Sequence, residues 1–269
     1  MGKLNLFRYM GGKYHMVDIV NKHLYYSTDT YIELFGGSAK ILLNKPQHRV
    51  EIYNDIDNDI YNLFSVVKNR KDEFIEALNY VIYSEKFFNE IRKSEPIDDI
   101  EKAIKTFCTI NMSFAGEGKT YGYCYTENIS KRFFSKVSNI DTIYNRIKNV
   151  VFLNKNYSDV LQSIKGKKNY CIYADPPYYN SNRYYEHKFT RETHVELAWW
   201  LNSLDHKIIL SYYYFPGIEN LYPRDKWNYF EYRKYKYSCK KVDMNGKRQQ
   251  SLELIITNFK TGEQITWEN

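Results

Sequence analysis

Short β-rich runs alternate with helical patterns along most of the chain, and this alternation constrains the fold more than any other feature. The expected strands are rich in Val, Ile, Leu and Tyr and end at polar or glycine-containing turns. They are residues 31–35, 50–53, 150–153, 170–174, 207–213 and 252–258. The helical patterns between them are residues 14–24, 39–44, 58–69, 142–148 and 190–204. Alternating strands and helices predict an α/β domain built on a mostly parallel sheet.

One stretch breaks this alternation. Residues from about 71 to 114 are helical in pattern throughout, with no buried strand. Residues 119–126 follow, with tyrosine at alternate positions, as in a half-exposed hairpin strand. We therefore predict that residues 65–140 are an insertion of mostly helical structure. The remainder, residues 1–64 and 141–269, is expected to form the sheet domain.

The composition suits a folded core and argues against a membrane-spanning chain. Hydrophobic residues make up 43% and charged residues 26% of 269 positions, and the mean hydropathy is -0.63. No uncharged apolar run approaches the roughly 18 residues that a membrane-crossing helix needs. The N-terminal residues lack the apolar core of a signal peptide. We therefore expect no membrane association and a cytoplasmic location.

Cysteine and histidine form neither a metal-binding pattern nor a disulfide framework. The 4 cysteines contain no CxxC pair, and the 6 histidines contain no HxxxH or HExxH pattern. Lys and Arg outnumber Asp and Glu by 39 to 32, so the net charge is +7 and the isoelectric point is about 8.9. An excess of positive charge suits a polyanionic partner. The sequence therefore predicts no metal site and is compatible with nucleic-acid binding.

A glycine turn follows the first expected strand, within the string YIELFGGSAKILLN. Gly36 and Gly37 have no Cβ, so a nucleotide can approach this backbone, and the following helix start offers N–H groups. Asp55 stands nineteen positions after Gly36, where doubly wound cofactor folds place a carboxylate on a ribose. The pattern predicts a nucleoside site, with a plain tight turn as the alternative. For Asp57 and Asp59, ligand binding and capping of the next helix are equal alternatives.

The string Asp175-Pro176-Pro177-Tyr178 comes directly after an apolar strand. Two prolines restrict the φ angle and remove two N–H donors, so the loop is stiff and its carbonyl oxygens can accept hydrogen bonds. Asp175 adds a carboxylate acceptor, and Tyr178 adds a flat aromatic face. Together these groups predict a pocket for a planar ligand with an exocyclic amino group. The alternative is a proline-rich turn packed by tyrosine.

These motifs resemble those of the Dam-like, D12 class of S-adenosylmethionine-dependent DNA adenine N6-methyltransferases. The resemblance rests on the strings FRYMGGK, ELFGGSA, NDID, FLNKNY and DPPY. It spans nearly the whole chain, since KFTRETHVELAWWL, IILSYYY and LELIITNF also fall in family order. The resemblance implies an α/β fold with a Rossmann-like methyltransferase sheet and an inserted, mostly helical target-recognition subdomain.

The resemblance also implies a cofactor and a catalytic site. The cofactor is S-adenosylmethionine, and the matching motif positions are Tyr9, Gly12, Lys13, Glu33, Phe35, Gly36, Gly37, Ser38, Asp55, Ile56, Asn156, Tyr157 and Asp175. Asn156 stands where the family pattern has an aspartate that contacts the cofactor adenine. The implied catalytic residues are Asp175, Pro176, Pro177 and Tyr178. No metal is implied.

The implied partner is double-stranded DNA, in a bacterial or phage-infected cell, and we expect a monomer or a weak dimer. Aromatic and basic side chains are candidates for DNA contacts, namely Tyr121, Tyr123, Lys131, Arg132, Lys240, Lys247 and Arg248. Family members that read GATC carry an Asn-Gly-Leu-x-Arg type segment where this chain has NMSFAGEGKTYGYCYTEN. We therefore assign no target sequence.

The implied reaction is direct methyl transfer to N6 of an adenine flipped out of the duplex. Hydrogen bonds from N6 to the Asp175 carboxylate and the Pro176 carbonyl are expected to assist the attack, with Tyr178 stacked on the base. Two alternatives use the same pocket: methylation of adenine N6 in RNA, or of cytosine N4. A protein glutamine methyltransferase is disfavoured because that family has Asn-Pro-Pro-Tyr. A non-catalytic nucleic-acid-binding homologue is disfavoured by the intact motifs.

Overall fold

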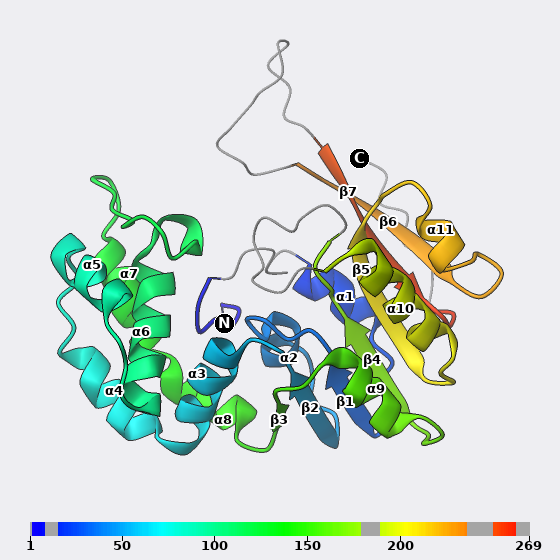
Figure 1. Ribbon diagram of the computed structural model, residues 1–269, viewed down its shortest axis with the longest axis horizontal. Coiled ribbons are helices and arrows are strands. Elements are labelled where there is room, and N and C mark those ends of the chain that lie inside the picture. Colours follow the sequence, from blue (N-terminus) through cyan, green and yellow to red (C-terminus); the bar gives the residue numbers. More distant parts are fainter. Residues whose placement is uncertain (1, 9–15, 179–188, 236–249, 262–269) are drawn as a thin grey trace, which may run out of the picture. The chain divides into compact units, whose positions relative to one another are not determined.

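The computed structural model describes residues 2–8, 16–178, 189–235 and 250–261, and the structural statements below concern these residues (Figure 1). Seven strands are hydrogen-bonded in the order β3-β2-β1-β4-β5-β7-β6. The chain divides into two compact units. Unit 1 comprises Met1–Val17, Gly36–Gln47 and Glu51–Asn156, and unit 2 comprises Asp18–Phe35, His48–Val50 and Tyr157–Asn269.

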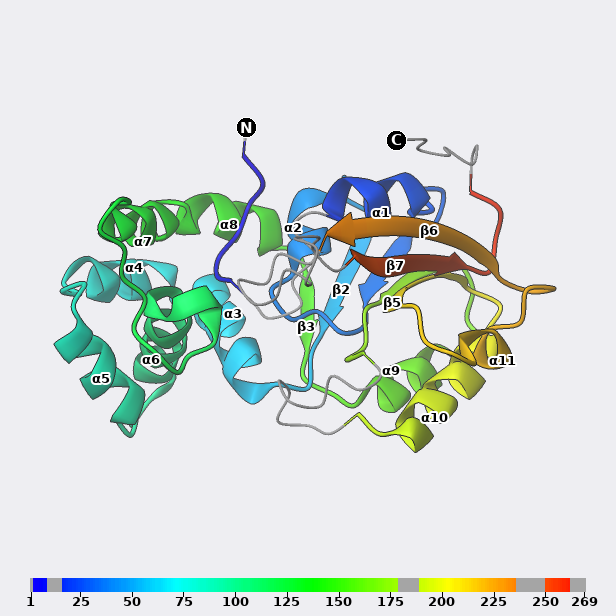
Figure 2. The ribbon, with the colours of Figure 1, turned by 90° about the horizontal axis from the view of Figure 1, so that it is seen from above.

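Unit 2 contains most of the sheet. Strands β1 (Thr30–Glu33), β4 (Tyr170–Ala174) and β5 (Lys207–Tyr213) pair in parallel. Strand β7 (Gln250–Thr257) pairs antiparallel with both β5 and β6 (Asn228–Tyr235). Helices α9 (Tyr157–Ile164) and α10 (Arg191–Asn202) lie on one side of this sheet, and α1 (Val17–His23) lies on the other (Figure 2). The predicted α/β fold with a mostly parallel sheet is confirmed.

Helices cover both faces of this sheet, and this explains why β4 and β5 are apolar along nearly their whole length. Helix α10 begins where the sequence predicts, because Thr190 Oγ1 accepts a hydrogen bond from Thr193 N at 3.3 Å. A short helix, α11 (Ile218–Leu221), follows β5.

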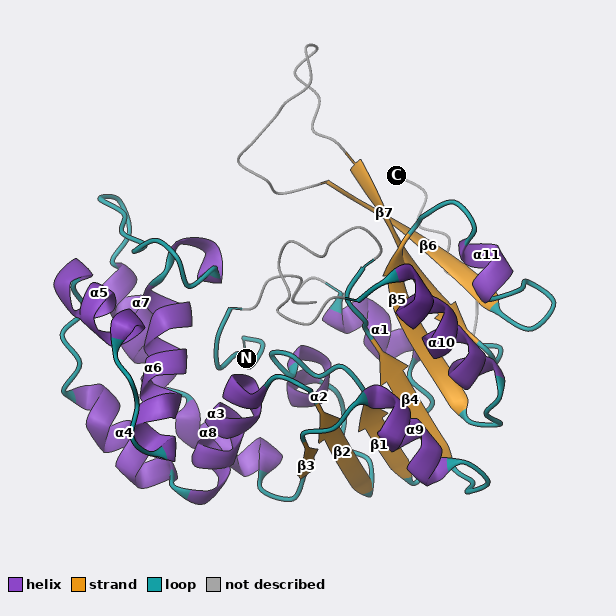
Figure 3. Cartoon of the chain, viewed as in Figure 1, coloured by secondary structure: helices purple, strands orange, loops and turns teal. Residues whose placement is uncertain are grey.

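Unit 1 contains a parallel strand pair and a group of helices (Figure 3). The strands are β2 (Val50–Asn54) and β3 (Val151–Leu153). The helices are α2 (Lys40–Asn44), α3 (Asn58–Asn69), α4 (Lys71–Asn79), α5 (Glu85–Lys93), α6 (Asp99–Met112), the 3-10 helix η1 (Phe114–Gly116), α7 (Ile129–Ser138) and α8 (Ile140–Ile147). Phe107 is fully buried among them, and its ring centroid lies 5.7 Å from that of Phe74 and 5.5 Å from that of Phe133. Residues 65–140 are mostly helical, and their role as a target-recognition insertion stays a prediction.

The expected hairpin strand at residues 119–126 is wrong. Tyr121 forms only an isolated bridge with Ser113. The chain turns sharply just before it, because Ala115 and Gly116 both have positive φ, at 53° and 80°. At Gly122 an added Cβ would lie 3.0 Å from backbone atoms of the preceding turn. The alternating tyrosines therefore belong to a folded-back loop rather than to a strand.

Strand β6 and helices α9 and α11 were not predicted from the sequence. Strand β6 reads NYFEYRKY, which mixes charged and aromatic residues. In the described part of the chain it is the last strand of the sheet, and it pairs with β7. Edge strands commonly carry charged side chains, which discourage pairing of their free backbone groups with another chain. Its sequence therefore lacks the apolar signal by which the inner strands were found.

In the described ranges, no helix combines the length and apolar character needed to cross a membrane. Within the same parts of the chain, no group of three or more His, Cys, Asp and Glu side chains is arranged to hold a metal ion. Cys108 and Cys171 are buried free thiols, and Cys124 is an exposed one.

Candidate active site

Strand register places a row of polar side chains on one face of the unit 2 sheet. Glu33 of β1 pairs with Tyr173 of β4. Tyr173 in turn pairs with Ile209 of β5, which lies two positions before Ser211. Farther along β5, Tyr213 pairs with Glu253 of β7. Paired residues share a face, and the face repeats at every second residue. Four strands therefore contribute polar groups to the side of the sheet on which Ser211 lies.

Asp175 follows the end of β4 and is held there by a hydrogen bond. Ser211 Oγ donates to Asp175 Oδ1 at 2.8 Å, and the Tyr173 hydroxyl lies 3.0 Å from the same Oγ. Ser211 is fully buried and Asp175 is half-buried. Burial, followed by the charge of Asp175, raises the pKa of Tyr173 well above its usual range. One oxygen of the carboxylate predicted to be catalytic therefore accepts a hydrogen bond from β5.

The other residues of the motif pack against the sheet. Pro176 is buried and Pro177 is half-buried. The Tyr178 hydroxyl donates to Glu253 Oε1 at 3.4 Å, and its ring centroid lies 4.3 Å from that of Tyr213. Tyr178 is 7% exposed and Tyr213 is 38% exposed. Tyr178 thus holds its end of the loop to the sheet, and its stacking on a base stays a prediction.

The glycine turn of unit 1 is shaped by Asp55. Gly37 N donates to Asp55 Oδ2 at 2.6 Å, and Asp57 N donates to Asp55 Oδ1 at 2.9 Å. Gly36 N donates to the Asn54 carbonyl at 2.8 Å, and Gly37 has a φ of 47°. The structure thus brings together the glycines and the carboxylate that the sequence pairs by spacing. A carboxylate has about four acceptor positions, so holding this turn and accepting a ribose hydroxyl are compatible roles.

No side chain fits at Gly36 without rearrangement. A Cβ there would lie 2.0 Å from Cε2 of Tyr53. Tyr53 is fully buried, and its hydroxyl donates to the Gly37 carbonyl at 2.6 Å. Its ring centroid lies 5.2 Å from that of Phe64 and 5.0 Å from that of Phe152. Packing of the turn against Tyr53 therefore requires glycine, a contact that the sequence did not reveal.

The remaining predicted cofactor residues of unit 1 differ in exposure. Ser38 is buried, whereas Ile56 and Asn156 are exposed. Asp57 accepts hydrogen bonds from two backbone N–H groups in the first turn of α3, at 2.9 and 3.1 Å, and therefore caps that helix. Asp59 forms an ion pair of 3.0 Å with a lysine of α6. The capping alternative is thus confirmed for Asp57, whereas the Asp59 side chain forms an ion pair in place of a cap.

Phe35 and Tyr157, both predicted to contact the cofactor, meet in unit 2. Their ring centroids are 5.5 Å apart, and the ring of Phe189 lies 5.9 Å from each of them. His194 of α10 packs on Phe189 at 4.6 Å and forms a hydrogen bond with Tyr212. Burial lowers the pKa of His194 to about 4, so this ring is neutral at physiological pH. Tyr157 and Phe189 are buried in this cluster and Phe35 is half-buried, and contact of these rings with a cofactor stays a prediction.

Glu33 is 2% exposed and accepts a hydrogen bond from the Tyr31 hydroxyl at 2.8 Å.

Six other predicted residues lie outside the described parts of the chain. They are the cofactor candidates Tyr9, Gly12 and Lys13 and the DNA-contact candidates Lys240, Lys247 and Arg248.

Four predicted DNA-contact residues lie in the helical part of unit 1. The rings of Tyr121 and Tyr123 are stacked, with centroids 6.4 Å apart, and Tyr123 is 63% exposed. Lys131 and Arg132 are exposed near the start of α7, and Arg132 forms an ion pair with Glu127 at 2.7 Å. Aromatic and basic side chains are thus accessible on this unit. Their contact with DNA stays a prediction.

Lys40, which the sequence analysis missed, directly follows the glycine turn. It is 5% exposed at the start of α2. Burial, followed by the charges of Lys136 and Arg8, lowers its pKa to about 7. The sequence signal that could have identified Lys40 is its position inside the otherwise apolar run AKILL.

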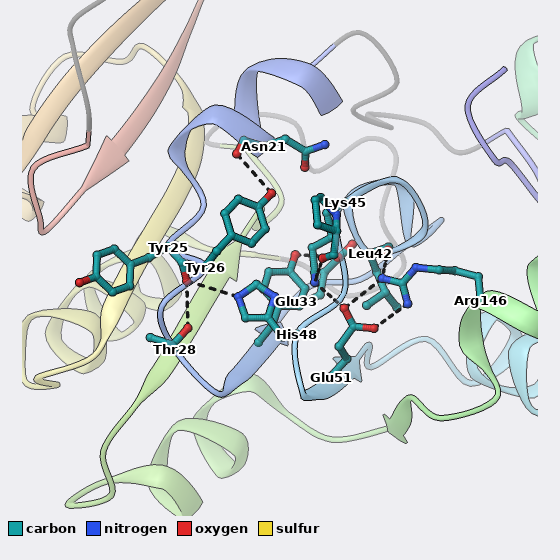
Figure 4. A network of polar contacts seen from close by, with 12 residues as sticks. Asn21, Tyr25, Tyr26, Thr28, Glu33, Leu42, Lys45, His48, Glu51 and Arg146 are labelled. Carbon is teal, nitrogen blue, oxygen red and sulfur yellow. Dashed lines mark hydrogen bonds and ion pairs between the residues drawn. The ribbon is translucent and has the colours of Figure 1, made fainter. Parts of the chain in front are cut away.

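A buried ion-pair network joins α2, β2 and α8 (Figure 4). Arg146 Nη1 donates to Glu51 Oε2 at 2.5 Å, and Lys45 Nζ donates to Glu51 Oε1. Arg146 also donates to the Leu42 carbonyl. Burial by itself raises the pKa of Glu51, but its bonds with Arg146 and Lys45 outweigh burial and leave that pKa below its ordinary value. The helix after the glycine turn is thereby anchored to α8.

Comparison with known proteins identifies similar sequences. The model of the family described as D12 class N6 adenine-specific DNA methyltransferase matches residues 9–235. A DNA adenine methylase from Escherichia coli (strain K12) is 24% identical over 209 residues, which cover 71% of this chain and 73% of that protein. A DNA adenine methylase from Serratia marcescens is 34% identical over 82 residues, covering 30% of this chain and 29% of that protein. A solved rRNA methylase from Streptococcus thermophilus covers 91% of this chain and 96% of its own, at 8% identity and a TM-score of 0.37, a likeness too weak to bear on the fold.

Proposed function

Because this chain belongs to the D12 class of N6 adenine-specific DNA methyltransferases, we propose that Asp175, Pro176, Pro177 and Tyr178 hold the adenine that is methylated. The observation that carries this proposal is the Asp175 carboxylate, half-buried after β4 and hydrogen-bonded to Ser211. The amino group of adenine is a poor nucleophile because its lone pair is delocalised into the ring. A fixed carboxylate that accepts a hydrogen bond from N6 stabilises the positive charge that develops on nitrogen during attack.

Asp175 and Pro176 each accept one hydrogen bond from the amino group of adenine. The Asp175 carboxylate accepts one N6–H, and the Pro176 carbonyl, on a backbone stiffened by two prolines, accepts the other. Two acceptors in fixed positions favour a pyramidal nitrogen whose lone pair points away from the ring. Asp175 needs only to be ionised for this role.

We propose that S-adenosylmethionine is the methyl donor. The Gly36–Gly37 turn supplies a backbone without Cβ atoms, and the Asp55 carboxylate supplies acceptors for ribose hydroxyls. Phe35 and Tyr157 supply aromatic surface. When bound, the cofactor supplies an electrophilic methyl group on a sulfonium sulfur. Glu33, Ser38, Ile56 and Asn156 are further proposed contacts.

We propose that the substrate is double-stranded DNA and that the target adenine is flipped out. A base inside a duplex cannot reach a loop after a sheet strand, and flipping costs a few kcal/mol of stacking and pairing. Residues 65–140 are the proposed reader of the target sequence, with Tyr121, Tyr123, Lys131 and Arg132 at its surface. Phosphate contacts by basic residues would offset the cost of flipping.

The test compares possible substrates directly. The protein is incubated with methyl-labelled S-adenosylmethionine and with double-stranded DNA, single-stranded DNA or RNA, and the nucleosides are analysed by mass spectrometry. We expect N6-methyladenine from double-stranded DNA, and its loss in Asp175→Asn while the variant remains folded and binds DNA. Label found only in RNA, in N4-methylcytosine or in protein would contradict the proposed substrate. Absence of transfer to every substrate would favour a non-catalytic homologue.

A further inference from the structure

One polar residue interrupts an otherwise apolar strand at the centre of unit 2. Strand β5 reads KIILSYY, and Ser211 within it is fully buried. Burying a hydroxyl costs free energy unless the group is hydrogen-bonded. The partners of this hydroxyl come from the neighbouring strand: Asp175 Oδ1 at 2.8 Å and the Tyr173 hydroxyl at 3.0 Å. Its hydrogen bonds with Tyr173 and Asp175 therefore explain why a serine is tolerated in this buried strand.

The single hydroxyl proton of Ser211 decides the direction of these hydrogen bonds. An ionised carboxylate only accepts, so Ser211 donates to Asp175. That commits the serine proton, and Tyr173 must then donate to Ser211 Oγ. The raised pKa of Tyr173, caused first by burial, keeps this donor protonated at working pH. The chain of donors runs from Tyr173 to Ser211 to Asp175.

We propose that Ser211 is the positioning residue of the Asp175 carboxylate and that Tyr173 aligns Ser211. Tyr173 and Asp175 are alternate residues, and β5 places Ser211 on the same face beside them. A carboxylate held at one oxygen cannot rotate freely about its Cβ–Cγ bond, so the direction of its second oxygen is set. The inference rests on the proposed function, because that function gives Asp175 its role toward adenine N6.

Ser211 also affects the charge of Asp175. A hydrogen bond donated to a carboxylate favours its ionised form, so removing the Ser211 hydroxyl raises the pKa of Asp175. Because the acceptor role needs the ionised form, the acidic limb of the kcat–pH profile should move to higher pH. Loss of orientation should also lower kcat by about 10-fold or more. The KM value for DNA depends on other contacts and should change little.

The test uses four variants of the full chain. Ser211→Ala should lower kcat about 10-fold and move the acidic limb upward, and Tyr173→Phe should act in the same direction with a smaller effect. Ser211→Thr keeps the hydroxyl and should retain both kcat and the limb position. Thr257→Val is the matched control: Thr257 is a fully buried residue of β7 whose Oγ1 donates to the Phe259 carbonyl at 2.8 Å. This control should leave kcat and the acidic limb unchanged.

Two results would overturn the role of Ser211. One is wild-type kcat and pH profile in Ser211→Ala. The other is an equal fall in kcat in Ser211→Ala and Thr257→Val, since this would report loosening of the sheet by loss of any buried hydroxyl.

Asp175→Asn separates failure of this inference from failure of the proposed function. If Asp175→Asn still methylates DNA, the proposed role of Asp175 fails and the role of Ser211 fails with it. If Asp175→Asn is inactive while Ser211→Ala behaves as wild type, only the role of Ser211 fails. Thermal unfolding of each variant establishes that the compared proteins are folded.

Discussion

Replacement of Gly36 by alanine is expected to destabilise the protein through a direct collision with Tyr53. The added Cβ would lie 2.0 Å from Cε2 and 2.4 Å from Cζ of Tyr53, so one of the two groups must move. Tyr53 is poorly able to move, because it is fully buried, its ring packs on Phe64 and Phe152, and its hydroxyl holds the Gly37 carbonyl. The collision is therefore with a constrained ring rather than with a flexible side chain.

The magnitude follows from these contacts. Overpacking of a well-packed core costs about 1–3 kcal/mol. Displacement of Tyr53 from the Gly37 carbonyl costs about 1 kcal/mol more. We therefore expect Gly36→Ala to lower the free energy of unfolding by roughly 2–4 kcal/mol. Gly37→Ala is the comparison variant: its φ of 47° lies in the left-handed region, which carries a backbone penalty of about 1–2 kcal/mol.

Urea unfolding followed by circular dichroism measures the change, and isothermal titration measures cofactor affinity. The double variant Gly36→Ala, Tyr53→Ala removes the collision, so it should be less destabilised than the sum of the single variants. Wild-type stability and cofactor affinity in Gly36→Ala would refute the reasoning. Strict additivity in the double variant would show that the loss does not arise from contact with Tyr53.

Two further predictions concern buried charges. The pKa of Lys40 is lowered to about 7 from 10.5, so its folded-state penalty is full below about pH 7 and fades as pH rises toward 10.5. Lys40→Met should therefore raise the free energy of unfolding most at or below neutral pH. Urea titrations in which the gain of the variant over the wild type grows with pH would contradict this. Arg146→Ala leaves Glu51 buried without its bidentate partner and should cost about 3 kcal/mol or more. Arg49→Ala removes an exposed pair and should cost less than about 1 kcal/mol, so equal losses in these two variants would refute the distinction.

Sequence signals within a few residues, such as helix caps and periodic apolar runs, predicted the helices that depend on them. The start of α10 follows from Thr190, and the bounds of α3 match the periodic run that begins after Asp57. The same reasoning failed at residues 119–126, where tyrosines alternate as in a strand but positive φ angles fold the chain back. Alternation indicates a strand only when a partner strand is present, and the partner is not a local property.

The site shows the same division. Spacing alone paired Asp55 with the glycine turn, because both follow neighbouring strands of a doubly wound fold, and the structure joins them by a hydrogen bond. The supports of Asp175 and Tyr178 were not predicted. Ser211 and Glu253 lie 36 and 75 residues away from their partners. Both lie in strings that fall in family order, IILSYYY and LELIITNF, but nothing in those strings marks either residue as a polar support.

The positions of most strands along the chain, the family motifs and the helix caps follow from short stretches of sequence, because periodicity, capping and loop stiffness act over a few residues. Which side chains meet across the sheet was decided only by tertiary structure. Strand register, set by pairing of distant segments, chose Ser211 for Asp175, Glu253 for Tyr178 and the ring of Tyr53 for Gly36. Such contacts depend on the relative placement of strands far apart in the chain, and a shift of one residue would exchange every face.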